Sequence, residues 1–139
     1  MQNENYLSEF GEYIKKRLSH YQITSSTENG LLVIQANAAD LYNIISFLQH
    51  DTYCQFERLE NLFSFKEARD TGKLALHYVL NNMEKKISVM VKVAVTQSVR
   101  SITEIYKSAH WLEREIWEKH QILFEGHKDL RRLFLENES

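Results

Sequence analysis

Residues whose types could do chemistry are concentrated near the end of the chain. The run Trp111-Leu112-Glu113-Arg114-Glu115 is followed by Phe124-Glu125-Gly126-His127 and then by Leu130-Arg131-Arg132-Leu133. Together these runs place arginines, acids, a glycine and a histidine among large apolar side chains. Such a segment could be a catalytic constellation or a surface that locks into a larger partner. The two interpretations put the function in different classes.

A metal site is the first chemical possibility, because three histidines fall in the last third of the chain, near Glu113, Glu115 and Glu118. Zinc sites use ligands at close, repeated spacings, such as two histidines four residues apart on a helix, and no pair here has that spacing. We therefore expect no metal. His127, which follows Gly126, is expected to be a hydrogen-bonded turn residue. His110 and His120 are expected to be polar residues that face a partner.

Acid–base catalysis is the second possibility, since Glu113 and Glu115 flank Arg114. Residues two apart on a helix point to different sides, so these carboxylates cannot easily share a proton or one substrate atom. Salt bridges around Arg114 and to neighbouring surfaces are the favoured interpretation. No nucleophile elbow, phosphate-binding loop or dinucleotide fingerprint occurs in the sequence.

Arg131 and Arg132 could grip phosphate, because guanidinium groups match phosphate oxygens. Arginine beside bulky apolar residues is also typical of the energetic centre of a protein interface. The net charge is negative and no glycine-rich cradle lies nearby, which favours the interface. Trp111 and Trp117 favour it too, although either could belong to the core.

The composition is that of an ordinary globular domain. The chain has 139 residues, 43% hydrophobic and 26% charged, with a formal net charge of -2. This balance gives no general attraction to nucleic acid or an anionic bilayer, and no apolar run approaches the ~20 residues that span a membrane. Cys54 is the only cysteine, which excludes an internal disulfide and a cluster held by this chain, and favours a reducing compartment. The start, Met1-Gln2-Asn3-Glu4-Asn5, lacks the features of a secretory signal.

Apolar periodicity predicts the elements of the first half of the chain. An amphipathic helix is expected at residues 6–20, followed by a polar turn cluster at 25–30 and a short buried strand at 31–34. A second helix should begin after an N-cap at Asp40 and end near residue 50, and part of 53–65 should be strand.

The clearest pattern lies between Leu74 and Val95, where apolar residues alternate on both sides of the loop 81–85. Period-two alternation predicts an antiparallel hairpin, and Lys92 on the alternate face indicates that this face is partly exposed to solvent. Ser101 and Glu104 have the spacing of a capping box, which predicts a short helix through Ala109.

A further helix at 111–120 and an extended stretch after Gln121 complete the expected order. We expect one α+β domain over residues 1–139, a two-layer fold with helices on one face of a small mixed sheet. Within it we expect the sheet-forming core at 30–98 and a helical and extended docking segment at 99–139.

The C-terminal segment resembles one subunit family of proton-pumping NADH:quinone oxidoreductase, respiratory complex I, known as the C-subunit family or the NADH dehydrogenase subunit 9 family. That family carries Ala-x-Trp, Glu-Arg-Glu, Gly-Ile-x-Phe-x-Gly-His-Pro and Leu-Arg-Arg-Ile-Leu in this order. The likeness extends over roughly residues 30–135. The matching residues in order and spacing are Ala109, Trp111, Glu113, Arg114, Glu115, Ile122, Phe124, Gly126, His127, Leu130, Arg131, Arg132 and Leu133.

The sequence departs from the family pattern at several positions. Glu118 replaces an aspartate, His120-Gln121 stands where the family has Phe-Gly, and Lys128 takes the place of proline. The family's tail with a Pro-Leu-Arg-Lys-Asp-Tyr run, which reaches over neighbouring subunits in relatives, is absent from this sequence. The resemblance therefore implies that the docking made by that tail is missing or is supplied by another chain.

What the resemblance implies is an assembly subunit without a cofactor of its own, whose signature serves docking. FMN, iron–sulfur clusters and quinone would be carried by other subunits. The expected partners are the quinone-site subunit, called the D subunit, and the B and I subunits of the same complex. The expected interface residues are Trp111, Glu113, Arg114, Glu115, Phe124, Gly126, His127, Arg131 and Arg132.

Alternative functions remain open at this point. The resemblance also allows the equivalent subunit of an energy-converting hydrogenase or of a ferredoxin:plastoquinone oxidoreductase, and the fold could serve a stand-alone adaptor or, less favoured, a self-contained enzyme. The expected location is the peripheral arm of a membrane complex, on the matrix side of the mitochondrial inner membrane or the cytoplasmic face of a bacterial one. The absence of proline and the divergent form favour the mitochondrial side.

Overall fold

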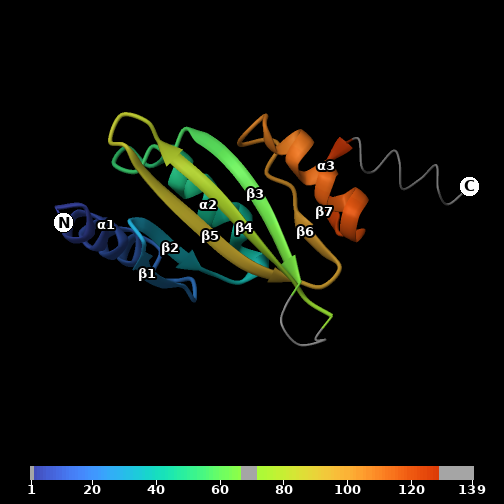
Figure 1. Ribbon diagram of the computed structural model, residues 1–139, viewed down its shortest axis with the longest axis horizontal. Helices are drawn as coiled ribbons and strands as arrows, with labels where there is room; N and C mark the ends of the chain where they lie inside the picture. The colour runs from blue at the N-terminus through green and yellow to red at the C-terminus, as the bar shows by residue number, and fades with distance from the viewer. Residues whose placement is uncertain (1, 67–71, 129–139) are drawn as a thin grey trace, which may run out of the picture.

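The computed structural model describes residues 2–66 and 72–128, and shows helices packed on a mixed sheet (Figure 1). The five strands of this sheet lie in the order β1-β2-β5-β4-β3, with β2 and β5 parallel and the other neighbours antiparallel. A second, two-stranded sheet pairs β6 with β7 in parallel. The elements are α1 Gln2–Arg17, β1 Thr24–Glu28, β2 Leu31–Gln35, η1 Ala38–Asp40, α2 Leu41–His50, β3 Arg58–Lys66, β4 Leu74–Asn82, β5 Ile87–Val95, β6 Ser98–Arg100, α3 Ala109–His120 and β7 Leu123–Glu125.

The predicted hairpin forms the centre of the large sheet. β4 and β5 pair in an unbroken antiparallel register from Leu74↔Val95 to Asn82↔Ile87. Their alternating residues bury one face, which carries Tyr78 and Val91, and leave His77 and Lys92 half-buried on the other. We call the face with His77 and Lys92 the outer face.

The α+β class with a mixed sheet is confirmed.

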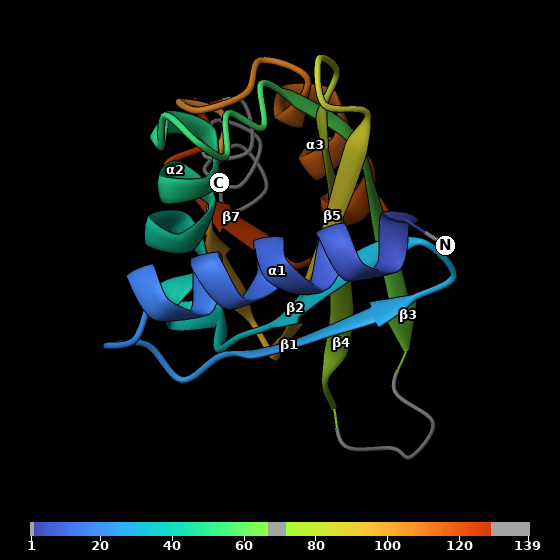
Figure 2. The ribbon, with the colours of Figure 1, turned by 90° about the vertical axis from the view of Figure 1, so that its left-hand side faces the viewer.

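Helices α1 and α2 cover the inner face of the sheet, as Figure 2 shows from the side of α1. The α1 helix crosses β1 and β2, and its Gly11 allows a close approach, because an added Cβ would overlap the Ser25 hydroxyl oxygen. Phe10 and Ile14 on its buried side are completely enclosed. Helix α3 lies along β3, where the Ser108 hydroxyl donates to the Leu59 carbonyl.

Several expected elements differ in the structure. The stretch expected as a polar turn cluster is largely strand β1, because its backbone pairs with β2 and only Asn29 and Gly30 form the turn, both with positive φ. The prediction of a short helix from Ser101 through Ala109 is wrong, since those residues form turns up to the start of α3. Asp40 precedes α2 as predicted, but its side chain makes no capping hydrogen bond.

Within residues 2–66 and 72–128, no helix combines the length and the apolar character that crossing a bilayer would require.

Candidate docking site around the C-terminal helix

Helix α3 and strand β7 hold the sequence-predicted signature in one compact unit. The helix ends at His120 because Gln121 takes the left-handed conformation, with φ 60°. The chain then reverses into β7, which pairs with β6 so that Val99 lies opposite Phe124. Gly126 follows with φ 91°, a backbone conformation that favours glycine and ends the strand in a turn.

Glu113 is the structural centre of this unit. Its side chain is fully buried, and both carboxylate oxygens accept hydrogen bonds from the turn that precedes α3. The Ser101 hydroxyl donates to one oxygen over 2.7 Å, and the Ile102 backbone N–H donates to the other over 2.9 Å. Burial raises the pKa of Glu113 to about 7, although these hydrogen bonds oppose the rise. The carboxylate therefore ties α3 to the turn at residues 101–106.

The capping-box interpretation assigned the Ser101 hydroxyl to a helix that does not form. The hydroxyl oxygen instead accepts from the Thr103 backbone N–H over 3.1 Å and donates to Glu113. This local side-chain hydrogen bond supports a turn, which is the usual competitor of a helix start for serine. The partner that decides the geometry, Glu113, comes from a later helix and could not be read from local spacing.

His127 and Phe124 lie in the interior beside the same turn. His127 is 1% exposed and its Nε2 donates to the His110 carbonyl oxygen over 2.8 Å, with the two imidazole rings 4.8 Å apart. Phe124 is 1% exposed within the hydrophobic core. His127 thus has the predicted role of a hydrogen-bonded turn residue after Gly126.

The outward side of α3 carries the exposed members of the signature. Trp111 is 64% exposed, the largest exposure among the large hydrophobic residues of the described chain. Arg114 lies one turn away and donates from Nε to the Glu118 carboxylate over 3.2 Å, while Glu115 is exposed. An exposed tryptophan beside an arginine is the side-chain combination typical of interface hot spots.

A hollow of about 360 Å³ lies next to this side of the molecule, between the turn before α3 and the turn after β7. Of its lining residues, Glu104 and Lys128 are exposed and His127 is buried. The complete lining is Thr103, Glu104, His110, Gly126, His127 and Lys128.

A second charged cluster at this turn was not predicted. The Arg100 guanidinium lies 3.5 Å above the Tyr42 ring, and the Tyr42 hydroxyl donates to Glu104 over 3.0 Å. The hydrogen bond to Glu104 is the main cause of the raised pKa of Tyr42. Because Tyr42 comes from α2, far away in sequence, no local signal could have joined it to the C-terminal segment.

The nine predicted interface residues thus fall into three groups. Trp111, Arg114, Glu115 and Gly126 lie at or near the surface, whereas Glu113, Phe124 and His127 are buried and make contacts inside the chain. Arg131 and Arg132 lie outside the described residues. Within the residues that the structure describes, no group of three or more potential ligands is placed to hold a metal ion. The interface role itself stays a prediction.

Comparison with known proteins gives the chain a family context. The model of the family described as "Respiratory-chain NADH dehydrogenase, 30 Kd subunit" matches residues 34–139. The chain is 31% identical over 133 residues to the NADH-quinone oxidoreductase C subunit of Paramagnetospirillum magneticum, covering 94% of this chain and 67% of the relative. It is 25% identical over 132 residues to the protein of the same name from Agrobacterium fabrum, covering 94% of this chain and 66% of that one. The chain thus spans about two thirds of the length of these relatives.

Two solved structures share the fold. The trypsin-resistant fragment of Nqo5 matches with a TM-score of 0.67 and 21% identity, over 87% of this chain and 96% of that one. A chain of the membrane-bound sulfane sulfur reductase, an archaeal respiratory membrane complex, matches with a TM-score of 0.73 and 18% identity, over 86% and 70%.

Proposed function

Because the chain belongs to the family of the 30 kDa subunit of respiratory-chain NADH dehydrogenase, we propose that it is an assembly subunit of the peripheral arm of a proton-pumping NADH:quinone oxidoreductase. In this role it supports electron transfer from NADH to ubiquinone and does no chemistry itself. The observation that carries the proposal is the arrangement around α3. A fully satisfied buried carboxylate fixes the helix from inside, and Trp111 and Arg114 face outward.

The chemistry of the described residues favours a role without a cofactor in this chain. The one carboxyl group of the signature with a strongly raised pKa, Glu113, is enclosed by its own chain and bonded on both oxygens. Cys54 is buried, and burial raises the pKa of its thiol, so it is neither a reactive nucleophile nor a ready ligand. FMN, iron–sulfur clusters and quinone then belong to other subunits of the complex.

We call the outward side of α3, with Trp111, Arg114 and Glu115, the α3 surface. Its proposed partner is the quinone-site subunit, with the B and I subunits close by. Arg131 and Arg132 join this surface on sequence grounds, together with Trp111, Arg114 and Glu115. Burying the Trp111 ring against a partner pocket would remove the largest exposed apolar side chain of the described residues from water. Glu113, Phe124 and His127 support the surface from beneath.

The proposed location is the matrix side of the mitochondrial inner membrane, with the cytoplasmic face of a bacterial inner membrane as the alternative. The relatives named above are bacterial. Fractionation of the source cell separates the two locations directly.

A second candidate is the equivalent subunit of another energy-converting membrane complex. The specific support is the fold of the archaeal sulfane sulfur reductase chain, whose TM-score of 0.73 exceeds the 0.67 of the Nqo5 fragment. The copurifying large subunit distinguishes the candidates, because a nickel-binding one indicates a hydrogenase and one like that of the sulfane sulfur reductase indicates a complex of that kind.

The assembly proposal is tested by surface variants of the full chain on native gels. Trp111→Ala and Arg114→Ala should each reduce the amount of chain in the large particle without lowering the melting temperature of the isolated chain. Tyr6→Ala and Lys16→Ala serve as controls, because both residues are exposed on α1. Normal incorporation of both α3 variants would contradict the proposed docking surface.

A further inference from the structure

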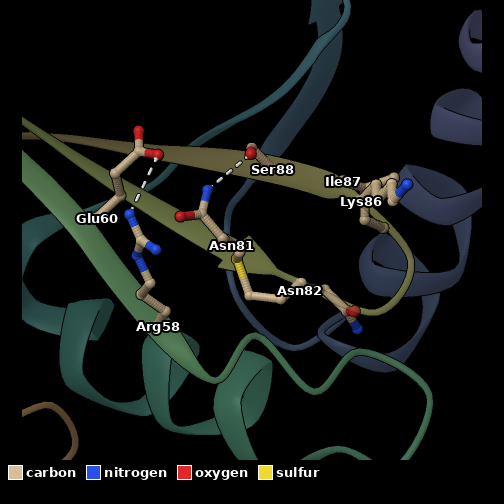
Figure 3. A pocket seen from close by; sticks show the side chains of 8 residues that line it. Arg58, Glu60, Asn81, Asn82, Lys86, Ile87 and Ser88 are labelled. Atoms are coloured by element: carbon tan, nitrogen blue, oxygen red, sulfur yellow. Dashed lines mark hydrogen bonds and ion pairs between the residues drawn. The ribbon is translucent and has the colours of Figure 1, made fainter.

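The outer face of the sheet carries a second polar site that the α3 surface does not include. A hollow of about 270 Å³ lies where the β4–β5 loop meets the beginning of β3 (Figure 3). Figure 1 places this loop at the left of the molecule and α3 at the right, so the two sites lie apart on the molecule. The lining residues are Arg58, Glu60, Asn81, Asn82, Met83, Lys86, Ile87 and Ser88.

Asn81 forms the floor of this hollow and has an unmatched hydrogen-bond acceptor. The residue is 6% exposed, and its Nδ2 donates to the Ser88 hydroxyl oxygen over 2.7 Å. Its Oδ1 is buried and has no hydrogen-bond partner among the described residues. Figure 3 shows this oxygen pointing to the side of the hollow that Arg58 and Glu60 line. Burying an acceptor without a donor is costly, so the arrangement favours a donor that comes from outside the chain.

The rim of the hollow provides cationic hydrogen-bond donors. The Arg58 side chain is 53% exposed, and its ion pair with Glu60 is long, at 3.8 Å between two exposed partners. Exposed pairs of this kind are weak, so the Arg58 guanidinium can turn toward a ligand oxygen. Lys86 adds an exposed ammonium group beside it. The site therefore presents one acceptor at its floor and cationic donors at its edge, which matches a ligand with an N–H next to a C=O.

The size and surroundings of the hollow indicate that this ligand is part of a polypeptide. Small-molecule sites usually enclose at least ~300 Å³, more than this hollow offers. Phe63 and Phe65 lie further along β3 on the same outer face and are 41% and 50% exposed. A free small amide would leave both rings in water, whereas a polypeptide surface can cover the rings and fill the hollow together.

We propose that this hollow receives an amide group, from an asparagine or glutamine side chain or a main-chain peptide, of a second partner polypeptide lying on the outer face. The proposal rests on the proposed function, because that partner is a neighbouring subunit of the same complex. The chain is then held on two sides, by one neighbour at α3 and by another at the sheet.

Chemical labelling of lysine amines in the wild-type complex tests this directly. The purified complex and the isolated chain are treated with acetic anhydride, and modification of Lys86 is compared by mass spectrometry. The proposal predicts that Lys86 is modified about tenfold more slowly in the complex, since covering the site removes solvent access. Equal reactivity in both forms would overturn the second contact and leave the proposed function intact. A wild-type chain that enters no large particle would overturn both.

A double variant, Asn81→Leu with Ser88→Ala, tests the amide recognition itself. It removes the unmatched acceptor together with the hydroxyl that Asn81 contacts, so the isolated chain should melt at the same temperature or higher. Its incorporation into the complex should fall about tenfold, the effect of losing one hydrogen bond across an interface. Gln35→Leu is the matched control. Gln35 lies on β2 and carries an exposed amide on the same outer face of the sheet. Wild-type incorporation of the double variant would refute the amide contact.

Discussion

The buried Glu113 makes the stability of the isolated chain depend on pH in a defined direction. Its pKa is about 7 in the folded chain, against 4.5 for an ordinary glutamate. The folded state therefore holds this proton more tightly than the unfolded state does. The stabilisation is complete below pH 4.5 and is lost as the pH rises through 7. A difference of this size corresponds to about 3 kcal/mol between the two ends of that range.

Glu113→Gln separates this effect from all other titrating groups. The glutamine side chain keeps a carbonyl oxygen for the Ile102 N–H and has no charge to bury. At pH 8 the variant should be more stable than the wild type. The gain should be about 3 kcal/mol, reduced by the cost of the altered Ser101 contact. Below pH 5 this advantage should vanish or reverse. Glu113→Ala should destabilise the chain at every pH, by about 2–4 kcal/mol, because it leaves the Ile102 N–H unpaired and a cavity behind.

Urea unfolding of wild type and Glu113→Gln between pH 4.5 and 8 measures the difference. His77 and His120 have lowered pKa values, so their effect on stability runs in the opposite direction, with stability rising as the pH increases. Comparing the variant with the wild type cancels this contribution, because both chains contain both histidines. A stability difference that stays constant over the whole pH range would refute the assignment of a strongly raised pKa to Glu113.

Three further predictions concern the interior. Gly11→Ala should lower stability by about 1–3 kcal/mol, because its Cβ would overlap the Ser25 hydroxyl; thermal unfolding measures this, and Gly11→Ala with Ser25→Gly should recover part of the loss. Tyr106→Phe should cost about 1–2 kcal/mol in urea unfolding, since the buried hydroxyl donates to the Phe56 carbonyl over 2.5 Å, and an unchanged midpoint would contradict that contact. Cys54 should react with a thiol reagent only after denaturant is added, because it is buried and its pKa is raised; rapid native labelling would show that this core opens.

The elements with clear periodicity could be predicted from sequence, and those determined by distant partners could not. The alternation in β4 and β5 reflects burial of one face, so the hairpin follows from local sequence. Strand β1 has the sequence Thr-Ser-Ser-Thr-Glu and lies at an exposed edge, where no apolar alternation is needed. Its strand conformation depends on pairing with β2, which local composition does not encode.

The candidate site shows the same division. Trp111 and Arg114 were expected at an interface, with the core left open for Trp111, and the structure places both on the outward side of α3. Glu113, flanked by charged residues, carried no sequence signal for full burial, because its burial depends on donors from the Ser101–Ile102 turn. The hollow at Asn81 was also unexpected, since it requires β3 to lie beside the β4–β5 hairpin.

The proposed function makes this chain a subunit of a large respiratory complex. The most direct measurement is purification of the tagged full-length chain from its own cells under mild conditions, followed by size separation and mass spectrometry of the copurifying chains. We expect elution in one large particle that contains the quinone-site subunit and oxidises NADH with a quinone as acceptor. Elution of the chain alone, as a small monomer, would contradict it.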